Sequence, residues 1–216
     1  MLKSRSSEVT ATPVADINSN LLPQLFERLV VGKQLQVLDL CGARSATVDL
    51  FSNFKCRLFI TNLLDEEFVT TPDEEASHEQ LVAQFRAALA LPEECKLNLC
   101  LFWDIFNYLD GPALRAFLEA LEPYVGENTR IFALGVLNAR TQLPNYSYAI
   151  RHLAQIQQSP GRIPQLPVYQ YSQRELNGLL DYLEIDKSRL LSDGRLEYIL
   201  CRSQGAKRSA NSIFGF

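Results

Sequence analysis

The chain has 216 residues, 47% of them hydrophobic and 21% charged, which suits one packed domain and excludes an intrinsically disordered protein. Its 21 basic and 25 acidic residues give a net charge of -4, which argues against binding nucleic acid through overall charge. Five cysteines without a Cys-x-x-Cys pair, together with the lack of a signal-peptide core or a long apolar run, indicate reduced thiols in a cytoplasmic protein.

Helices and strands alternate along the sequence. Apolar residues at helical spacing predict helices over residues 21–30, 47–54, 77–91, 110–121 and 172–183. Short β-rich runs predict strands over residues 35–40, 57–63, 96–103, 130–136, 183–186 and 196–201. Capping boxes that begin at Ser77 and Ser172 mark the starts of two helices. This order predicts a mostly parallel sheet covered on both faces, with ligands at the carboxyl ends of its strands.

The two ends and one internal stretch do not follow this pattern. Residues 1–18 and 204–216 are polar and are expected to be flexible tails around a domain of residues 19–203. Residues 137–171 contain four prolines and are expected to be an irregular insertion with a short helix over residues 148–157.

Four segments, taken in order, carry a family resemblance. Residues 37–43 (Val-Leu-Asp-Leu-Cys-Gly-Ala) and 99–109 (Leu-Cys-Leu-Phe-Trp-Asp-Ile-Phe-Asn-Tyr-Leu) each end a predicted strand. With the elements at 118–134 and 171–201, they resemble the class I S-adenosylmethionine-dependent methyltransferases. The resemblance implies an α/β, three-layer Rossmann-like methyltransferase fold. Its mostly parallel, seven-stranded sheet ends in antiparallel strands joined at Asp193-Gly194, and the insertion 137–171 lies on the substrate side.

The resemblance also implies a set of cofactor-binding residues: Asp39, Gly42, Asn62 and Asp104. Two of them have a second interpretation, because Asp39 is also suited to anchoring its loop and Asp104 to capping a turn with Asn107. Asp65 is an alternative to Asn62 as the cofactor contact after the second strand.

The cofactor loop departs from the family pattern. Glycines let the backbone approach a cofactor closely and adopt positive φ, whereas the residues after Leu40 are Cys41, Gly42, Ala43, Arg44 and Ser45. Arg44 is large enough to fill the methionine pocket. After the second strand, where the family places a ribose-binding carboxylate, the chain has Asn62. We therefore expect weak S-adenosylmethionine binding or none.

Other kinds of site have little support in the sequence. Only two histidines occur, His78 and His152, on different predicted elements, so no metal site is expected. No phosphate-binding loop, Gly-x-Gly-x-x-Gly motif or nucleophile elbow is present. Cys41 is interpreted as a small buried residue in place of glycine, not as a reactive thiol.

Charge is segregated along the chain. Residues 65–79 hold seven carboxylates and no Lys or Arg, whereas residues 128–174 hold arginines and tyrosines but no acidic residue. Arg and Tyr are frequent in binding hot spots, so a partner-binding surface is predicted at Arg140, Arg151, Arg162, Tyr146 and Tyr148, and an acidic partner would suit it. Solvated loop residues are the simpler interpretation of the same stretch.

The resemblance and the altered loop together predict a non-catalytic, methyltransferase-like module that binds or regulates a protein. The alternative is an active S-adenosylmethionine-dependent methyltransferase for a small molecule or protein, with the edge from Asp104 to Tyr108 facing the substrate. Catalysis would then come from holding the substrate nucleophile in line with the methyl group. A nucleic-acid binder that uses the arginines is a third interpretation.

Overall fold

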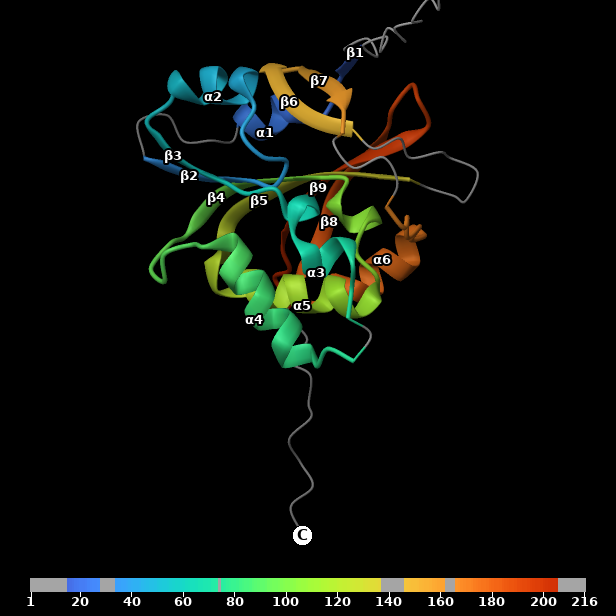
Figure 1. Ribbon diagram of the computed structural model, residues 1–216. Helices are drawn as coiled ribbons and strands as arrows, with labels where there is room; N and C mark the ends of the chain where they lie inside the picture. Colours follow the sequence, from blue (N-terminus) through green and yellow to red (C-terminus); the bar gives the residue numbers. More distant parts are fainter. Residues whose placement is uncertain (1–14, 28–33, 74, 137–145, 162–165, 206–216) are drawn as a thin grey trace, which may run out of the picture.

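A computed structural model describes residues 15–27, 34–73, 75–136, 146–161 and 166–205 (Figure 1). Its centre is a six-stranded sheet in the order β3-β2-β4-β5-β9-β8. The strands are β2 (Leu35–Asp39), β3 (Cys56–Ile60), β4 (Leu97–Trp103), β5 (Val125–Val136), β8 (Leu183–Leu190) and β9 (Arg195–Arg202). The first four are parallel, and β9 runs antiparallel to both β5 and β8.

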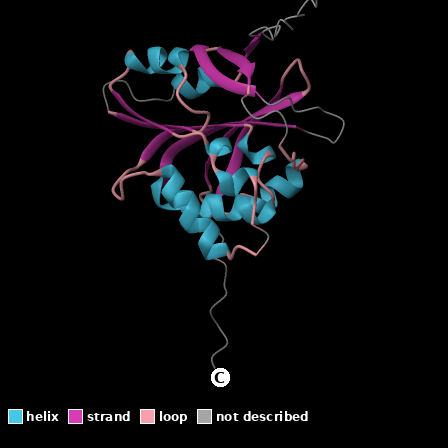
Figure 2. Ribbon diagram, viewed as in Figure 1, coloured by secondary structure: helices cyan, strands magenta, loops and turns pink. Residues whose placement is uncertain are grey.

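One face of this sheet is covered by helices (Figure 2). These are α3 (Glu67–Thr70), α4 (His78–Leu89), α5 (Gly111–Leu121) and α6 (Gln173–Leu179). The short 3₁₀ helices η1 (Leu63–Asp65), η2 (Ile105–Asn107) and η3 (Glu122–Tyr124) complete the connections on this side. The predicted capping boxes are present at the starts of α4 and α6, and the Asp110 carboxylate caps α5.

The other face is covered by two helices and a second, three-stranded sheet (Figures 1 and 2). The helices are α1 (Leu22–Glu27) and α2 (Ser45–Ser52), and the sheet has the order β1-β7-β6. Its strands are β1 (Ala15–Asn18), β6 (Tyr146–His152) and β7 (Gln155–Pro160). Tyr148, Ile150 and Ile156 are fully buried between this small sheet and the main one.

Burial explains why the main strands read as continuous apolar runs. In β4, Cys100 and Phe102 pack toward the α4–α5 side while Leu99, Leu101 and Trp103 pack toward the small sheet. A parallel strand with both faces covered has no solvent side that could take polar residues. The three-layer, Rossmann-like α/β fold with a mostly parallel sheet that the sequence predicts is confirmed, including the antiparallel β8–β9 pair around Asp193-Gly194.

Three expectations about the elements need correction. The main sheet has six strands in the described residues, not seven, because the chain after β3 goes through η1 and α3 to α4 without adding a strand outside β3. This stretch is highly acidic, and a buried strand cannot hold unpaired carboxylates. The helix expected over residues 148–157 is the β6–β7 hairpin instead, and residues 15–18 of the expected tail form β1, which pairs with β7.

None of the described helices is long and apolar enough to span a membrane.

Candidate functional site

The carboxyl ends of β2, β3 and β4 bring together the residues that the sequence proposed for the cofactor. Asp39 ends β2, Asn62 follows β3, and Asp104 follows β4. Gly42 lies in the loop between β2 and α2, where a short bridge joins Cys41 to Asn62. All four predicted cofactor residues therefore lie at the edge of the sheet where ligands of this fold class bind.

Asp39 is fully buried and anchors its own loop. Its Oδ1 accepts hydrogen bonds from the Trp103 indole Nε1 at 2.7 Å and from the Cys41 backbone nitrogen at 3.0 Å. Its Oδ2 has no hydrogen-bond partner among the described residues. Burial raises the pKa of Asp39 from 3.8 to about 6, although the Trp103 and Cys41 hydrogen bonds oppose that rise.

The loop glycine turns toward β3 and does not face an open cradle. Gly42 has φ of +76°, a value that favours glycine, and its nitrogen donates to the Thr61 carbonyl oxygen at 3.0 Å. A Cβ added at Gly42 would lie 3.4 Å from the Cβ of Asn62. The one glycine of the loop is thus used for contact between two parts of the chain.

The small sheet closes the loop from the other side. The backbone nitrogen of Tyr148, in β6, donates to the Cys41 sulfur at 3.0 Å. Burial raises the pKa of Cys41 to about 12, so this thiol stays protonated at neutral pH. Cys41 is therefore a half-buried, unreactive thiol in contact with β6.

Asp104, Tyr148 and Arg195 form a buried network at the same edge. The Tyr148 hydroxyl donates to Asp104 Oδ2 at 2.6 Å and accepts from Arg195 Nη1 at 2.9 Å. Arg195 also donates from Nε to Asp193 Oδ2 at 2.9 Å. Burial raises the pKa of Asp104 to about 6, against the effect of the Tyr148 hydrogen bond and the Arg195 charge. We call Asp104, Tyr148 and Arg195 the carboxyl-edge network.

Trp103 joins this network to Asp39. Its ring stacks on Tyr148 with centroids 5.2 Å apart and planes 10° apart. Its φ is +55°, a left-handed conformation that is unfavourable for a bulky side chain. Strain of this kind persists only where the surroundings fix it, and the hydrogen bond to Asp39 and the stacking on Tyr148 do so here.

Three buried polar atoms near this edge lack a partner among the described residues. They are Asp39 Oδ2, Arg44 Nε and the Tyr108 hydroxyl. Burial, together with the charge of Asp104, raises the pKa of Tyr108 well above its usual value. Buried polar groups are usually paired, so water or a polar ligand would be needed to satisfy these atoms.

The residues do not fit the cofactor cradle that the resemblance implies. The positions where glycines are expected hold Cys41, Ala43 and Ser45, and Cys41 is in contact with β6. Asn62, in place of a ribose-binding carboxylate, lies against Gly42. Among the described residues, no group of three or more His, Cys, Asp or Glu side chains is placed to hold a metal ion.

The predicted partner-binding residues are not all on one surface. Arg151 is exposed and forms an ion pair with Asp16 at 3.2 Å, and Tyr146 is half-buried. Tyr148 is fully buried, so its prediction as a surface contact is wrong. Tyr148 and Ile150 are two residues apart on β6, so both side chains point to the same, inward face of the strand. Arg140 and Arg162 lie outside the described residues.

Sequence reasoning missed Trp103, Tyr148 and Arg195 as members of this site, whereas Tyr108 belongs to the edge that the alternative assigned to the substrate. The only tryptophan of the chain directly precedes Asp104 at a strand end, which is a usable signal for Trp103. Tyr148 and Arg195 come from β6 and β9, far along the chain, and only the folded topology brings them to Asp104.

The fold and this edge define an α/β domain with a mostly parallel sheet and a cluster of buried polar residues at the carboxyl ends of its strands. No protein-family model matches the chain, and no curated protein matches it either. Solved structures do. The pyocyanin biosynthetic protein PhzM is similar at 14% identity and a TM-score of 0.46, over 85% of this chain and 55% of PhzM.

Two further structures illustrate the same likeness. An S-adenosylmethionine-dependent methyltransferase from Clostridium acetobutylicum ATCC 824 matches 85% of this chain and 89% of its own length, at 13% identity and a TM-score of 0.46. The mitomycin 7-O-methyltransferase MmcR matches 84% of this chain and 53% of its own length, at 13% identity and a TM-score of 0.49. At these identities the likeness concerns the fold alone.

Proposed function

We propose that this domain is a methyltransferase-like module that does not transfer methyl groups from S-adenosylmethionine and that works by binding a protein partner. The observation that carries the proposal is the closure of the carboxyl edge by Tyr148. Its backbone nitrogen bonds Cys41 in the loop after β2, and its hydroxyl bonds Asp104 after β4. One residue of the small sheet thus connects the loop that contains Gly42 with Asp104, two of the places at which the resemblance implies contacts with the cofactor.

The buried contacts around Tyr148 make this closure stable. Stacking on Trp103 and the hydrogen bond from Arg195 hold the ring, and Ile150 two residues later is fully buried. The backbone nitrogen of Ile150 also donates to the Thr47 hydroxyl in α2 at 3.0 Å. To admit a ligand over Cys41, β6 would have to leave both the loop and α2, and buried polar atoms would lose their partners.

A specific observation favours the second candidate, an active methyltransferase. Asp39 Oδ2, Arg44 Nε and the Tyr108 hydroxyl are buried and lack partners among the described residues. A polar ligand at the carboxyl edge would supply them. In that case Asp39 and Asp104 would orient the ligand, and the substrate would need only to be held in line with the methyl group.

Calorimetric titration with S-adenosylmethionine and with its demethylated product separates the two candidates. We expect no binding, or a Kd weaker than about 1 mM. A micromolar Kd would reject the proposal and support the active enzyme. Under that outcome Asp39→Asn should weaken binding at least about tenfold, while Asp49→Asn on the exposed side of α2 should not.

The partner surface is the second part of the proposal. The exposed Arg151 and the half-buried Tyr146 belong to the small sheet, and Arg140 and Arg162 come from the same acid-free segment. Arg151 is paired with Asp16, but residues 128–174 carry arginines and no acidic residue, and an excess of positive charge speeds encounter with an acidic protein.

Charge reversal tests this surface. The variant Arg140→Glu, Arg151→Glu, Arg162→Glu should lose a partner that wild-type protein recovers from cell lysate, with folding verified by circular dichroism. The matched control reverses three exposed arginines elsewhere, Arg86, Arg115 and Arg189. If both triple variants recover the wild-type set of partners, the arginine surface is not the binding site.

A further inference from the structure

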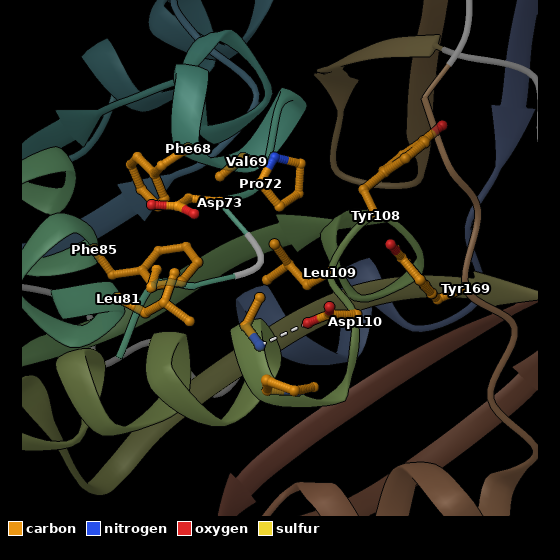
Figure 3. Close-up of a pocket in the computed structure, with 13 residues that line it drawn as sticks. Phe68, Val69, Pro72, Asp73, Leu81, Phe85, Tyr108, Leu109, Asp110 and Tyr169 are labelled. Carbon is orange, nitrogen blue, oxygen red and sulfur yellow. Dashed lines mark hydrogen bonds between the residues drawn. The ribbon is translucent and has the colours of Figure 1, made fainter. Parts of the chain in front are cut away.

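A cavity of about 160 Å³ lies on the helical side of the main sheet (Figure 3). It is lined by α3, α4, the loop between them, the start of α5 and Tyr169, and also by Tyr108, whose hydroxyl is one of the unpartnered atoms of the carboxyl edge. Most of its wall is apolar and comes from Phe68, Val69, Pro72, Leu81, Phe85 and Leu109. Figure 3 shows these side chains converging on one space, with the Asp73 and Asp110 carboxylates beside it.

The size and wall of the cavity suit one aromatic ring. A protein cavity of about 150 Å³ lined by Leu, Ile and Phe binds benzene. In this cavity Phe68 and Phe85 meet edge to face, with centroids 4.9 Å apart, so a third ring would find both ring edges and ring faces.

The charge around the cavity is of one sign. Asp73 and Asp110 are the charged residues among those that line it, and no Lys, Arg or His is in the described lining. The Asp110 carboxylate accepts from the Ala113 nitrogen at 2.8 Å, and the exposed Asp73 accepts from Glu75 at 3.0 Å. Asp73 belongs to the segment 65–79, which has seven carboxylates. The cavity therefore favours an aromatic group attached to positive charge.

The chain contains a segment with this chemistry immediately after its last described residue, Gly205. Residues 206–216 read Ala-Lys-Arg-Ser-Ala-Asn-Ser-Ile-Phe-Gly-Phe, with two basic residues followed by two phenylalanines. They contain no Asp or Glu. Lys207 and Arg208 complement the carboxylates, and Phe214 or Phe216 supplies the ring.

The segment starts beside α5 and is long enough to reach the cavity. Arg202 donates to the Val125 carbonyl oxygen and to the Glu122 carboxylate, just past the end of α5. The cavity lies at the start of the same helix, whose 11 residues span roughly 16 Å. The nine residues 206–214, which follow Gly205, extend to about 30 Å.

We propose that this cavity binds residues 206–216 of the same chain, with one phenylalanine ring inside it and Lys207 and Arg208 against the carboxylates of the 65–79 segment. The segment then covers the apolar wall formed by α3, α4 and α5. This assignment does not depend on the proposed function, because it uses neither the carboxyl-edge network nor the arginine surface.

Fluorescence polarisation with a labelled peptide of residues 204–216 tests the assignment on the full chain. The acceptor is the variant Phe214→Ser, Phe216→Ser, in which the cavity is open. This variant should bind the peptide at least tenfold more tightly than wild-type protein, whose own segment competes. A peptide with both phenylalanines replaced by serine should bind at least tenfold more weakly than the native peptide.

Variants at the cavity complete the test. In the open acceptor, Ala113→Leu fills the cavity and should weaken peptide binding at least tenfold, whereas Ala83→Leu on the exposed side of α4 should leave it unchanged. Asp73→Lys, an exposed substitution that should not disturb folding, should also weaken it. Three results would overturn the proposal: no binding at millimolar peptide, equal binding to wild-type protein and to the double serine variant, or a loss of peptide binding in Ala83→Leu equal to that in Ala113→Leu. A wild-type dimer that the serine variant does not form would assign the occupant to a second copy and overturn the same-chain assignment.

Discussion

Tyr148 holds two strand ends together through one hydroxyl group. It donates to the buried Asp104 carboxylate and accepts from the largely buried Arg195. Hydrogen bonds to charged groups are worth more than neutral ones, and a buried charge that loses its partner is costly. Tyr148→Phe should therefore lower the free energy of unfolding by about 2–3 kcal/mol, measured by urea denaturation.

Tyr146→Phe is the matched control for this prediction. Tyr146 is on the same strand but half-buried, and its loss of one hydroxyl should change stability by less than about 0.5 kcal/mol. An equal effect of the two substitutions would mean that the hydroxyl of Tyr148 does not stabilise the carboxyl edge.

The raised pKa of Asp104 makes stability depend on pH. Because burial raises this pKa from 3.8 to about 6, the folded protein holds the proton more tightly than the unfolded chain. The stabilisation of the folded state by protonated Asp104 is therefore fully present below about pH 4 and is lost as pH rises through about 6. Asp104→Asn cannot titrate and keeps an acceptor for the Tyr148 hydroxyl.

Relative to wild type, Asp104→Asn should thus gain roughly 2–3 kcal/mol of stability between pH 4 and pH 7. Chemical denaturation of both proteins across this range measures the gain. Asp49→Asn, at an exposed position of α2, should follow the wild-type pH dependence. A constant difference between Asp104→Asn and wild type would contradict the raised pKa.

At the scale of the elements, apolar runs and caps predicted most of the main sheet. Residues 96–103 were expected to be a buried strand and form β4, and the capping boxes at Ser77 and Ser172 start α4 and α6. Such signals are local, so they survive without knowledge of the fold. The β6–β7 hairpin was missed because its turn at His152 to Gln155 lacks the Gly or Asn that usually marks a hairpin.

The spacing of Tyr148 and Ile150, two residues apart, is the strand-like signal in β6, but it covers only part of a short strand. The edge position of β1 was not predictable either. It depends on pairing with β7, about 140 residues later in the chain.

Ser19 fixes the segment between β1 and α1 to the main sheet. Its hydroxyl donates to the buried Glu197 carboxylate at 2.6 Å and accepts from the Leu22 nitrogen at 2.9 Å, at the start of α1. Ser19→Ala should therefore cost about 2–3 kcal/mol, because a cap is lost and a buried carboxylate loses a donor. Thermal unfolding measures the change, with Ser52→Ala at the exposed end of α2 as the control. A small effect at Ser19 would show that the bonds of Glu197 to this segment do not stabilise the fold.

At the scale of the whole molecule, the predicted cofactor positions and the observed site differ in one informative way. Asp39, Gly42, Asn62 and Asp104 do lie together, because strand ends of a parallel sheet meet at one edge. What fills the space beside them comes from β6, in a segment that the sequence marked only as an insertion. Local motifs thus predict which residues lie at the carboxyl edge of the sheet, whereas long-range packing determines whether a ligand can reach them.

The two apolar cores share the strands of the main sheet, and this predicts how the molecule unfolds. Cys100 and Phe102 of β4 pack in the core under α4 and α5, while Leu101 and Trp103 pack in the core under the small sheet. Losing either core would expose one face of β4 to water, so the cores should unfold together in one transition. Trp103 is the only tryptophan and reports on the small-sheet side, whereas far-ultraviolet circular dichroism is dominated by the helices, most of which lie on the other side. The urea midpoints from fluorescence and from circular dichroism should coincide, and an earlier fluorescence midpoint would show that the small sheet separates first and leaves the carboxyl edge open.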